Sequence, residues 1–512
     1  MNVLILLLKI SYIVVPSLTY NILAVFTHPG RSHQAVFGRI VRELVSRGNK
    51  VTVVVHYGYD IQNENYTQIV LEDLDKTGGN FFDLKMFEMP VVLSQMMHPF
   101  QLADLGLVSC SKMLSNPDVK ELIGSQKKFD LILAEFFNSE CVLGFVNKFR
   151  APLVGVSTGL LMPWHGDRLG NPDNPGYIAN SHLGTSSRMG FLDRCYNFVG
   201  TQWYKVVYWW RLNDCQKIIE EHFGKIISSL HELMKNTSLL LVNSHFSFAF
   251  SRPLVPSIVE ISGVHLSSVK PLPTNIEKFI NESKHGVIYF SLGSMIKGHT
   301  FPQEKKDAFL KAFARLPQRV LWKWENETMP GKPDNVMIQK WMPQFDILSH
   351  PNVKAFISHG GLLGTTEAVH CGVPMMVMPQ YGDQYTNAKA VEANGGGVIL
   401  YLKDATEEKV YNNLKTILDP EFRAKAKALS ERFRDRPMSP MDTAIYWVEY
   451  VARHKGAPHM KTAAVDMPLY QYLLLDVLAF LGLILLVFSY ISYKILSLVL
   501  RSVFSKKKVK QN

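Results

Sequence analysis

The chain has 512 residues, which is long enough for two domains with additional segments. Hydrophobic residues make up 47% of the sequence and charged residues 19%, as in globular proteins. The net charge is +11, but six positive charges lie in the acid-free segment after residue 493, and the rest are spread thinly over the remaining chain. This distribution excludes the continuous basic surface of a nucleic-acid-binding protein, so we expect no nucleic-acid partner.

The N-terminus is an apolar run that ends in Pro16-Ser17-Leu18-Thr19. A signal peptidase reads small residues at such positions, so we predict a signal peptide over residues 1–19, although Lys9 interrupts the apolar run. The alternative is a buried first strand. It is disfavoured because residues 21–26 already supply the first strand of the domain that follows.

Near the C-terminus, residues 473–493 are apolar except for Asp476, and their length is close to the roughly 20 residues of a membrane-spanning helix. We predict a transmembrane helix there and a basic cytosolic tail over residues 494–512, because basic flanks stay on the cytosolic side. The protein would be a single-pass type I membrane protein with a lumenal body. Lys508 and Lys510 resemble the dilysine signal for return to the endoplasmic reticulum, and the alternative is a basic anchor for anionic lipid.

Four acceptors for N-glycosylation fit a lumenal body, although chance matches to so short a pattern are common. They are Asn65, Asn236, Asn281 and Asn326.

The cysteines are few and odd in number, and they show no paired spacing. They are Cys110, Cys141, Cys195, Cys215 and Cys371. This pattern argues against both a disulfide framework and a zinc site.

The first half of the chain, residues 20–255, is predicted to be an α/β domain. A strand at residues 21–26 leads through a loop into a helix from His33 to about Arg47, whose apolar residues recur at helical spacing. With a strand at residues 51–55 these elements form a right-handed parallel βαβ unit. Further strands are predicted at residues 129–134 and 152–156, with a helix between them. The segment 203–210 is rich in Trp and Tyr and either lines an apolar pocket, contacts a membrane or belongs to a buried helix.

The second half begins after a proline-rich stretch without periodicity, where we predict an interdomain linker over residues 256–274. Residues 275–460 then alternate again between strands and helices. The predicted strands cover residues 286–290, 319–322, 336–339, 353–357 and 375–378, and helices follow Pro302, Glu407 and Glu421. The expected fold class is α/β, with two Rossmann-like domains.

The segment from Phe356 to Gln384 carries the most specific pattern of the chain. A buried strand breaks at Ser358-His359-Gly360-Gly361 and passes into a helix, and a second strand leads to Asp383-Gln384. A strand, a glycine-rich turn and a helix place backbone N–H groups and a helix N-terminus against phosphate. Polar residues at the carboxyl ends of neighbouring parallel strands share one crevice.

This segment resembles the signature of the UDP-glycosyltransferase family, in the membrane-bound form found in animals. The signature positions are met by His359, Gly361, Glu367, Pro374, Pro379, Asp383 and Gln384. The resemblance implies the GT-B fold, in which two Rossmann-like domains face each other across a cleft. It also implies a UDP-sugar as co-substrate and no cofactor.

The resemblance further assigns roles to residues of the second domain. Ser291, Gly293 and Ser294 would contact the diphosphate, Trp341 would stack on uracil, Gln344 would bind the uridine, and Glu367 would bind the ribose hydroxyls. His359 would donate to the diphosphate, helped by N–H groups of the turn through Gly361, Gly364 and Thr365. Asp383 and Gln384 would hold sugar hydroxyls; the alternative for this pair is an N-cap of the next helix.

Sugar transfer to a hydroxyl also needs a base, and His33 is the candidate. With Ser32 as N-cap, His33 would lie in the first turn of its helix, where the helix dipole disfavours an imidazolium. A neutral imidazole can accept a proton. Glu135, at the end of a strand, would orient it and stabilise the charge that forms. The family has Asp at this position, so the alternative for Glu135 is a structural or capping role, and for His33 an ordinary loop histidine.

Leu363 departs from the family pattern, because many members carry Asn there, facing the phosphates or the sugar. Leucine offers no hydrogen-bond donor to an anionic donor, which favours UDP-glucose over UDP-glucuronate. The expected reaction is the inverting transfer of a hexosyl group to a hydroxyl of a small lipophilic acceptor, a chemistry typical of detoxification. The apolar residues 87–97 and the membrane location suggest a lipophilic acceptor. The oligomeric state stays open, a homo-oligomer included.

Other functions fit the sequence less well. Gly155-Val156-Ser157-Thr158-Gly159 matches the G-x-S-x-G pattern of serine esterases, but prolines and glycines follow where that fold needs a helix. A nicotinamide oxidoreductase is disfavoured because the turn at residues 28–32 lacks G-x-G-x-x-G. Asp73-Leu74-Asp75 has the spacing of a manganese site but lies outside the donor signature, so we predict no metal requirement. The remaining rival is a non-catalytic, lipophile-binding membrane protein.

Overall fold

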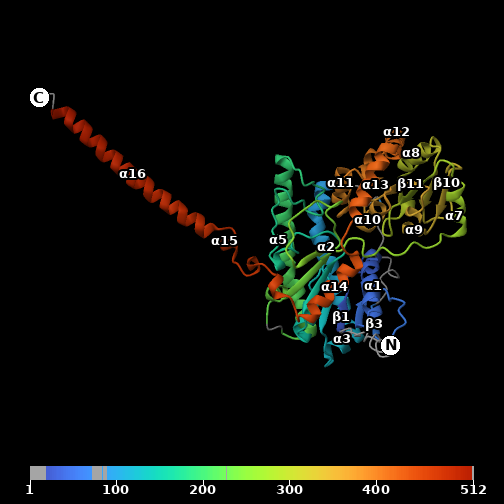
Figure 1. Ribbon diagram of the computed structural model, residues 1–512, viewed down its shortest axis with the longest axis horizontal. Coiled ribbons are helices and arrows are strands. Elements are labelled where there is room, and N and C mark those ends of the chain that lie inside the picture. The colour runs from blue at the N-terminus through green and yellow to red at the C-terminus, as the bar shows by residue number, and fades with distance from the viewer. Residues whose placement is uncertain (1–18, 72–83, 85–88, 226–227, 510–512) are drawn as a thin grey trace, which may run out of the picture. The chain divides into compact units, whose positions relative to one another are not determined.

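The first sheet contains seven parallel strands in the order β3-β2-β1-β4-β5-β6-β7 (Figure 1). In chain order these are β1 (Asn21–Val25), β2 (Lys50–Val55), β3 (Tyr66–Val70), β4 (Leu131–Glu135), β5 (Leu153–Ser157), β6 (Thr237–Val242) and β7 (Ile258–Glu260). Strands β4, β5 and β6 are buried along their whole length, as expected where helices cover both faces of a parallel sheet. The strands predicted around residues 21–26, 51–55, 129–134 and 152–156 are confirmed.

These coordinates are a computed structural model that describes residues 19–71, 84, 89–225 and 228–509. The predicted signal peptide lies outside the described residues apart from Thr19, and so do Asp73-Leu74-Asp75 and Lys510. The chain divides into two units, one that ends at Lys461 and one that begins at Thr462.

The helices of the first domain cover both faces of this sheet. They are α1 (Arg31–Ser46), α2 (Val91–Ser115), α3 (Pro117–Gly124), α4 (Val142–Phe149), α5 (Phe191–Phe223) and α6 (Leu230–Met234). Helix α1 buries Val36, Ile40 and Leu44 against the sheet, which confirms the predicted amphipathic helix. The Trp- and Tyr-rich segment 203–210 lies in α5, where Tyr204 is buried and Trp210 is exposed.

The second sheet has six parallel strands in the order β10-β9-β8-β11-β12-β13. They are β8 (Val287–Ser291), β9 (Arg319–Lys323), β10 (Val336–Gln339), β11 (Val353–Ser358), β12 (Met375–Val377) and β13 (Gly397–Ile399). The helices of this domain are α7 (Thr274–Asn281), α8 (Gln303–Ala314), α9 (Gln344–Leu348), α10 (Leu362–Cys371), α11 (Gln384–Ala393), α12 (Glu407–Leu418) and α13 (Pro420–Arg434). Short 3-10 helices also occur along the described part of the chain, at Asp167–Leu169, Gly298–Thr300, Leu402–Asp404, Pro458–Met460 and Ala463–Val465.

The interdomain linker is shorter than the predicted range 256–274. Residues 258–260 form β7, which pairs with β6 and completes the first sheet. This strand was not predicted, because it lies in a proline-rich stretch and is only three residues long. Its stability comes from the neighbouring strand. The connection between the domains therefore begins after Glu260.

The predicted extent of the second domain, residues 275–460, also differs from the structure. Helix α14 (Pro440–Arg453) packs against the first sheet, where Ile445 and Val448 share a core with Ile22 and Val51. Figure 1 shows α14 beside α1 rather than among α8 to α13. The chain thus returns to the first domain before residue 461.

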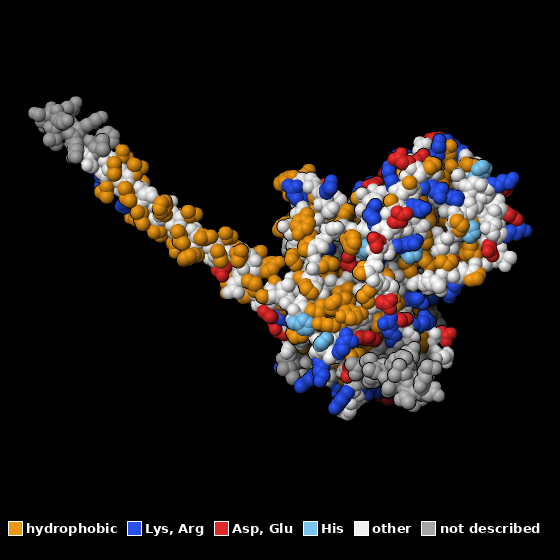
Figure 2. Space-filling view, viewed as in Figure 1, with side chains coloured by type: hydrophobic (Ala, Val, Ile, Leu, Met, Phe, Trp, Pro, Cys, Tyr) orange, Lys and Arg blue, Asp and Glu red, His pale blue; other side chains and the backbone are white. Residues whose placement is uncertain are grey.

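The second unit contains α15 (Leu469–Tyr472) and the long helix α16 (Leu475–Val509). Residues Leu475–Ser502 are long and apolar enough to cross a membrane, with a mean hydropathy of 2.3, and Figure 2 shows apolar side chains along the helix. A candidate membrane span is therefore present where residues 473–493 predicted one. The helix continues to Val509, so the predicted boundary at residue 494 does not mark a change in backbone structure.

One expectation about the cysteines is wrong, because Cys110 of α2 and Cys141, just before α4, form a disulfide. The two residues are 31 positions apart, so sequence spacing could not reveal the pair. The sulfur of Cys215 lies within 4.8 Å of both. Since two of the three sulfurs are bonded to each other, they are not the thiolates that zinc requires.

The four predicted glycosylation acceptors lie at the surface. Asn236, Asn281 and Asn326 are exposed, and Asn65 is partly exposed at the start of β3. Their glycosylation stays a prediction.

Candidate active site

His33 lies in the first turn of α1, which begins at Arg31 immediately after the loop that follows β1. The N-cap is Gly30 rather than the predicted Ser32, and no side chain caps the helix. The position of His33 near the positive end of the helix dipole is unchanged by this correction. Glu135 is the last residue of β4, the strand that pairs with β1.

The structure brings His33 and Glu135 together, with 2.6 Å between Nδ1 of the imidazole and Oε1 of the carboxylate. The other carboxylate oxygen, Oε2, accepts a hydrogen bond of 2.9 Å from the backbone N–H of His28. The ring of Phe137 lies 4.8 Å from the His33 ring. Glu135 is therefore held at both oxygens, and its contact to Nδ1 leaves Nε2 of His33 to face other groups.

Two residues of this site were not predicted from the sequence. The hydroxyl of Thr158 lies 2.9 Å from Nδ1 of His33, and the ring of His28 packs edge-on to the His33 ring at 4.2 Å. Thr158 directly follows β5, so the rule that strand ends share one crevice could have found it. The esterase pattern at this position singles out Ser157 instead.

Burial is the largest cause of the pKa shifts of His33, His28 and Glu135. It lowers the pKa of His33 to about 3 and the pKa of His28 to about 3, the latter with a contribution from the neighbouring His33. The same burial raises the pKa of Glu135 to about 7. Each shift favours the uncharged form of the group. At neutral pH His33 is therefore an uncharged imidazole, which can accept a proton.

The esterase alternative fails on local structure. Strand β5 ends at Ser157, and the next helical element is the short 3-10 helix at Asp167–Leu169. The Ser157 hydroxyl donates to backbone oxygens of its own turn, those of Gly159 at 3.3 Å and Leu160 at 3.5 Å. A nucleophile elbow requires a helix directly after the serine, so this serine is not one.

In the second domain, the turn after β8 approaches His359. Gly293 has φ +79°, and a Cβ atom at this position would lie 2.6 Å from Cε1 of the His359 ring. Both facts require glycine there. The Ser291 hydroxyl accepts a hydrogen bond of 3.2 Å from the N–H of Gly293, and Ser294 lies half-buried in the same turn. The turn at Gly293 thus lies against His359, and these four residues are among those predicted to contact the diphosphate.

His359 follows β11 and leads through Gly360, at φ +84°, to Gly361, the N-cap of α10. Nδ1 of His359 and the hydroxyl of Thr365 are both buried, and neither has a hydrogen-bond partner among the described residues. Burial, with a contribution from Lys323, lowers the pKa of His359 to about 4. Unpaired buried polar atoms are rare in folded proteins, so this turn has the character of a ligand site.

Lys323 was not predicted from the sequence. It is the last residue of β9, and its Nζ donates to the backbone oxygen of Gly293 at 2.9 Å and forms an ion pair with Glu325 at 3.1 Å. Its ammonium group lies 6.0 Å from the ring centre of Trp341. The end of β9 was a usable signal, because β9 pairs directly with β8.

Trp341, Gln344 and Glu367 lie around the beginning of α9 and the middle of α10. Trp341 is 70% exposed, so it is not a core residue and its ring face is open for stacking. Gln344 donates through Nε2 to Oε2 of Glu367 at 2.7 Å. A Cβ atom at Gly364 would lie 3.0 Å from Nε2 of Gln344, so glycine leaves space for this bond.

Asp383 and Gln384 lie at the start of α11. Asp383 is the N-cap residue, but its side chain makes no capping hydrogen bond and accepts from Asn387 instead at 2.9 Å. Burial raises the pKa of Asp383 to about 6. Gln384 accepts through Oε1 from the backbone N–H groups of Gln380 at 2.9 Å and Tyr381 at 3.3 Å. Its amide oxygen therefore shapes the preceding turn, and the capping alternative for this pair is not realised by side chains.

Leu363, in the first turn of α10, contacts the first domain. It is half-buried and packs against the hydrophobic core of the first sheet, which also contains Val264 and Met460.

The two domains also meet where the Thr386 hydroxyl accepts from the N–H of Gly184 at 3.1 Å and donates to the backbone oxygen of Asn180 at 3.2 Å.

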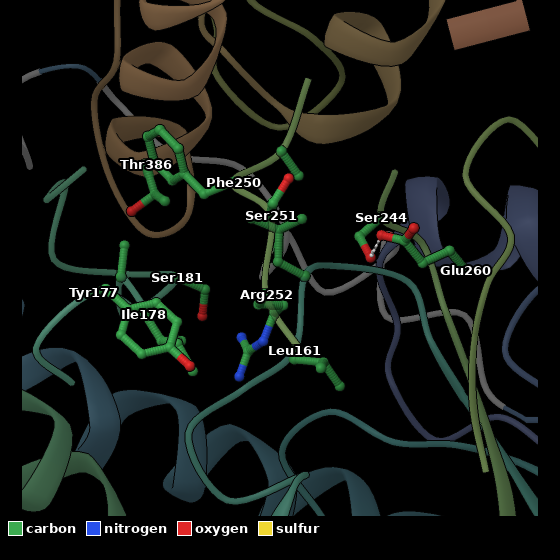
Figure 3. A pocket seen from close by; sticks show the side chains of 13 residues that line it. Leu161, Tyr177, Ile178, Ser181, Ser244, Phe250, Ser251, Arg252, Glu260 and Thr386 are labelled. Carbon is green, nitrogen blue, oxygen red and sulfur yellow. Dashed lines mark hydrogen bonds between the residues drawn. The ribbon is translucent and has the colours of Figure 1, made fainter. Parts of the chain in front are cut away.

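A cavity lies beside this second contact, between Thr386 and the segments that follow β5 and β6 (Figure 3). The Arg252 guanidinium points into the space between Ile178 and Leu161. Its nearest described carboxylate is that of Asp173, at 3.9 Å. The cavity contains none of the residues predicted from the sequence.

Comparisons with known proteins agree with this architecture. Residues 23–510 match the family model described as UDP-glucoronosyl and UDP-glucosyl transferase. The chain is 44% identical over 475 residues to UDP-glycosyltransferase UGT5 of Dactylopius coccus, covering 91% of this chain and 90% of that protein. It is 33% identical over 482 residues to UDP-glucuronosyltransferase 1A3 of Rattus norvegicus, covering 90% and 89%. The structure of the spinosyn forosaminyltransferase SpnP aligns with a TM-score of 0.58 at 15% identity, covering 85% of this chain and all of that one.

The structural similarity identifies the two parallel-sheet domains as a GT-B fold. The family match covers nearly the whole chain, and the relatives are similar over nine-tenths of their length. This protein therefore belongs to the UDP-glycosyltransferase family and is a glycosyltransferase enzyme.

Proposed function

We propose that the enzyme transfers a hexosyl group from a UDP-sugar to the hydroxyl of a small lipophilic acceptor, with His33 as the base. The observation that carries this proposal is the contact of 2.6 Å between Nδ1 of His33 and Oε1 of Glu135. A neutral imidazole held through Nδ1 by a carboxylate presents the lone pair of Nε2 to an incoming hydroxyl.

The reaction is a single in-line displacement. Nε2 of His33 takes the acceptor proton, the acceptor oxygen forms a bond to the anomeric carbon, and the bond from that carbon to the phosphate oxygen breaks. UDP leaves with the electron pair of that bond. Attack opposite the leaving group inverts an α-linked donor to a β-glycoside. Glu135 stabilises the imidazolium that forms, as the carboxylate does in a serine hydrolase.

The donor diphosphate would lie against His359 and the turns at Gly293 and Gly361. Support comes from the unpaired Nδ1 of His359 and the unpaired hydroxyl of Thr365, both buried at the N-terminus of α10. Such a helix end attracts an anion through its free N–H groups and its dipole. Trp341 offers its open ring to uracil, and Lys323 adds a positive charge on the same side.

We favour UDP-glucose as the donor, and UDP-glucuronate is the alternative. Leu363 supplies no hydrogen-bond donor for a glucuronate carboxylate. Its side chain packs against the core of the first sheet. UDP-glucosyltransferase 2 of Dactylopius coccus is 41% identical to the chain. Asp383 and Gln384 would bind the sugar hydroxyls, which are common to both donors.

For the acceptor, apolar surroundings at the base support a lipophilic compound. Phe137 packs against both His33 and His28, at 4.8 and 4.9 Å between ring centres. The candidate span Leu475–Ser502 would keep the enzyme at a membrane, where lipophilic compounds concentrate. We further propose an endoplasmic-reticulum location with a lumenal body, on the basis of the sequons and the terminal lysines.

A donor panel tests this proposal. UDP-glucose, UDP-glucuronate, UDP-galactose and UDP-xylose are each supplied with one simple phenol, and UDP release and glycoside formation are measured. The highest kcat/KM is expected with UDP-glucose, and the product is expected to be the β-glycoside. A clear preference for UDP-glucuronate would overturn the donor assignment, and an α-glycoside would overturn the one-step mechanism.

A further inference from the structure

His265 is a buried histidine that the mechanism above does not use. It lies in the segment between β7 and α7 that joins the two domains, and its side chain is 5% exposed. Neither ring nitrogen has a partner with hydrogen-bond geometry among the described residues. Burial lowers the pKa of His265 to about 4, and a contact with the backbone of Leu363, which does not meet hydrogen-bond geometry, acts in the opposite direction. A neutral, buried and unsatisfied imidazole is costly unless a ligand completes its hydrogen bonds.

The ring points toward Glu367, the residue expected to bind the ribose. Nε2 of His265 and Oε1 of Glu367 are 3.9 Å apart, which is too long for a hydrogen bond between them. The second oxygen of Glu367, Oε2, already accepts from Gln344 at 2.7 Å. Burial raises the pKa of Glu367 to about 7. The two side chains therefore face each other across a short gap without forming a strong ion pair.

The size of this gap suits one hydroxyl group. An oxygen atom that lies beside the two side chains can be about 2.8 Å from both Nε2 and Oε1, which are 3.9 Å apart, with an angle near 90° at the oxygen. A hydroxyl can donate to a carboxylate and accept from an imidazole N–H at the same time.

We propose that His265 is a donor-binding residue, whose Nε2–H donates to the same ribose hydroxyl that donates to Glu367. The inference rests on the proposed UDP-sugar function and adds a residue from the interdomain segment to the nucleotide site. The neighbours of His265 connect both domains, since the Ser262 hydroxyl lies 3.5 Å from that of Thr366 and Arg39 donates to the backbone oxygen of Leu266 at 3.5 Å. Bound nucleotide thus links α10 to the segment that joins the domains.

The experiment compares the binding of UDP, 2′-deoxy-UDP and 3′-deoxy-UDP by titration calorimetry, with the full-length protein in detergent. The native protein is expected to bind one of the two deoxy analogues roughly tenfold more weakly than UDP, as for the loss of one or two hydrogen bonds. His265→Ala should weaken UDP binding by roughly the same factor and leave the affinity for that analogue unchanged. The His265→Gln amide can donate from the position of Nε2, so this variant should retain much of the preference for UDP.

A loss that is equal for all three nucleotides in His265→Ala would show a structural role and overturn the proposal, and so would a native protein that does not distinguish the three. Failure of the native protein to bind UDP at all would instead overturn the proposed function. His454→Ala, at an exposed histidine just after α14 and outside the candidate site, is the control and should behave like the native protein. If His265→Ala does not fold, the comparison of His265→Gln with the native protein decides, and loss of the preference in a folded His265→Gln counts against the proposal.

Discussion

At the scale of single residues, the proposed role of His33 as base depends on the protonation state of Glu135. The His33–Glu135 pair is buried, and burial raises the pKa of Glu135 to about 7 while it lowers that of His33 to about 3. When the carboxyl is protonated, it donates to Nδ1, and the proton of the neutral imidazole then lies on Nε2. The ring is then no base toward the acceptor. If His33 is the base, activity therefore requires the ionised form of the carboxyl.

The rate of transfer should therefore depend on pH. A carboxyl with a raised pKa is protonated below that pKa, so kcat/KM should fall as the pH drops below about 7 and reach a plateau above it. In Glu135→Gln the titrating group is absent, so this fall should disappear, and kcat should be lower by roughly 100- to 10,000-fold at all pH values. The measurement is the pH profile of kcat/KM for both proteins.

Glu232→Gln, an exposed residue of α6, is the control and should keep the native profile. An unchanged acidic limb in Glu135→Gln would assign the titration to another group and contradict the account.

The residues that could be predicted from the sequence are those for which a motif or a strand end was recognised. His33, Glu135 and His359 were found in this way, and the structure brings the first two into contact. Lys323 and Thr158 lie at strand ends too, but no motif marks Lys323, and the pattern around Thr158 is that of serine esterases. His265 could not be found, because its proximity to Glu367 depends on how the interdomain segment returns over α10.

At the scale of elements, sequence periodicity predicted most of the buried strands, but it did not predict the buried strand β6, the long helices α2 and α5, or the strands β3, β7 and β13. Strand β3 has a mostly exposed pattern at the edge of the first sheet, and β7 and β13 have three residues each. Such strands are stabilised by their neighbours rather than by their own residues. Helix α14 shows the same limit, since its apolar stripe predicts a buried face but does not reveal which sheet covers it.

The position of α14 can be tested with Ile445→Ala. Ile445 is fully buried in the core that α14 shares with β1 and β2. Removing this side chain should lower the free energy of unfolding by about 2–5 kcal/mol. Hydrogen exchange should become faster in β1 and β2 and stay unchanged in β8 and β11.

Val410→Ala is the matched control, because Val410 of α12 is buried in a core of the second sheet. It should produce the opposite pattern of exchange. Faster exchange in the second sheet upon Ile445→Ala would contradict the assignment of α14 to the first domain.

At the scale of the whole molecule, the unit that ends at Lys461 contains both sheets and all the candidate site residues, whereas the unit from Thr462 contains the candidate membrane span. This separation predicts that catalysis and membrane anchoring can be divided. A variant that ends at Lys461 should be released from membranes by an alkaline carbonate wash and should still bind UDP. The full-length protein should stay with the membrane.

Retention of the shortened variant on membranes would contradict this division. The exposed apolar residues at the start of α5 would then be the surface to examine; they include Phe191, Leu192, Phe198 and Val199.

The central claim is that His33 removes the acceptor proton and does not hold the donor. The most direct measurement compares His33→Ala with the native enzyme, using kcat for glycoside formation and the Kd of UDP from calorimetry. The account predicts a fall in kcat of roughly 100- to 10,000-fold with the Kd of UDP unchanged. Glycoside formation at the native rate, or a loss of UDP binding that explains the lower rate, would contradict it.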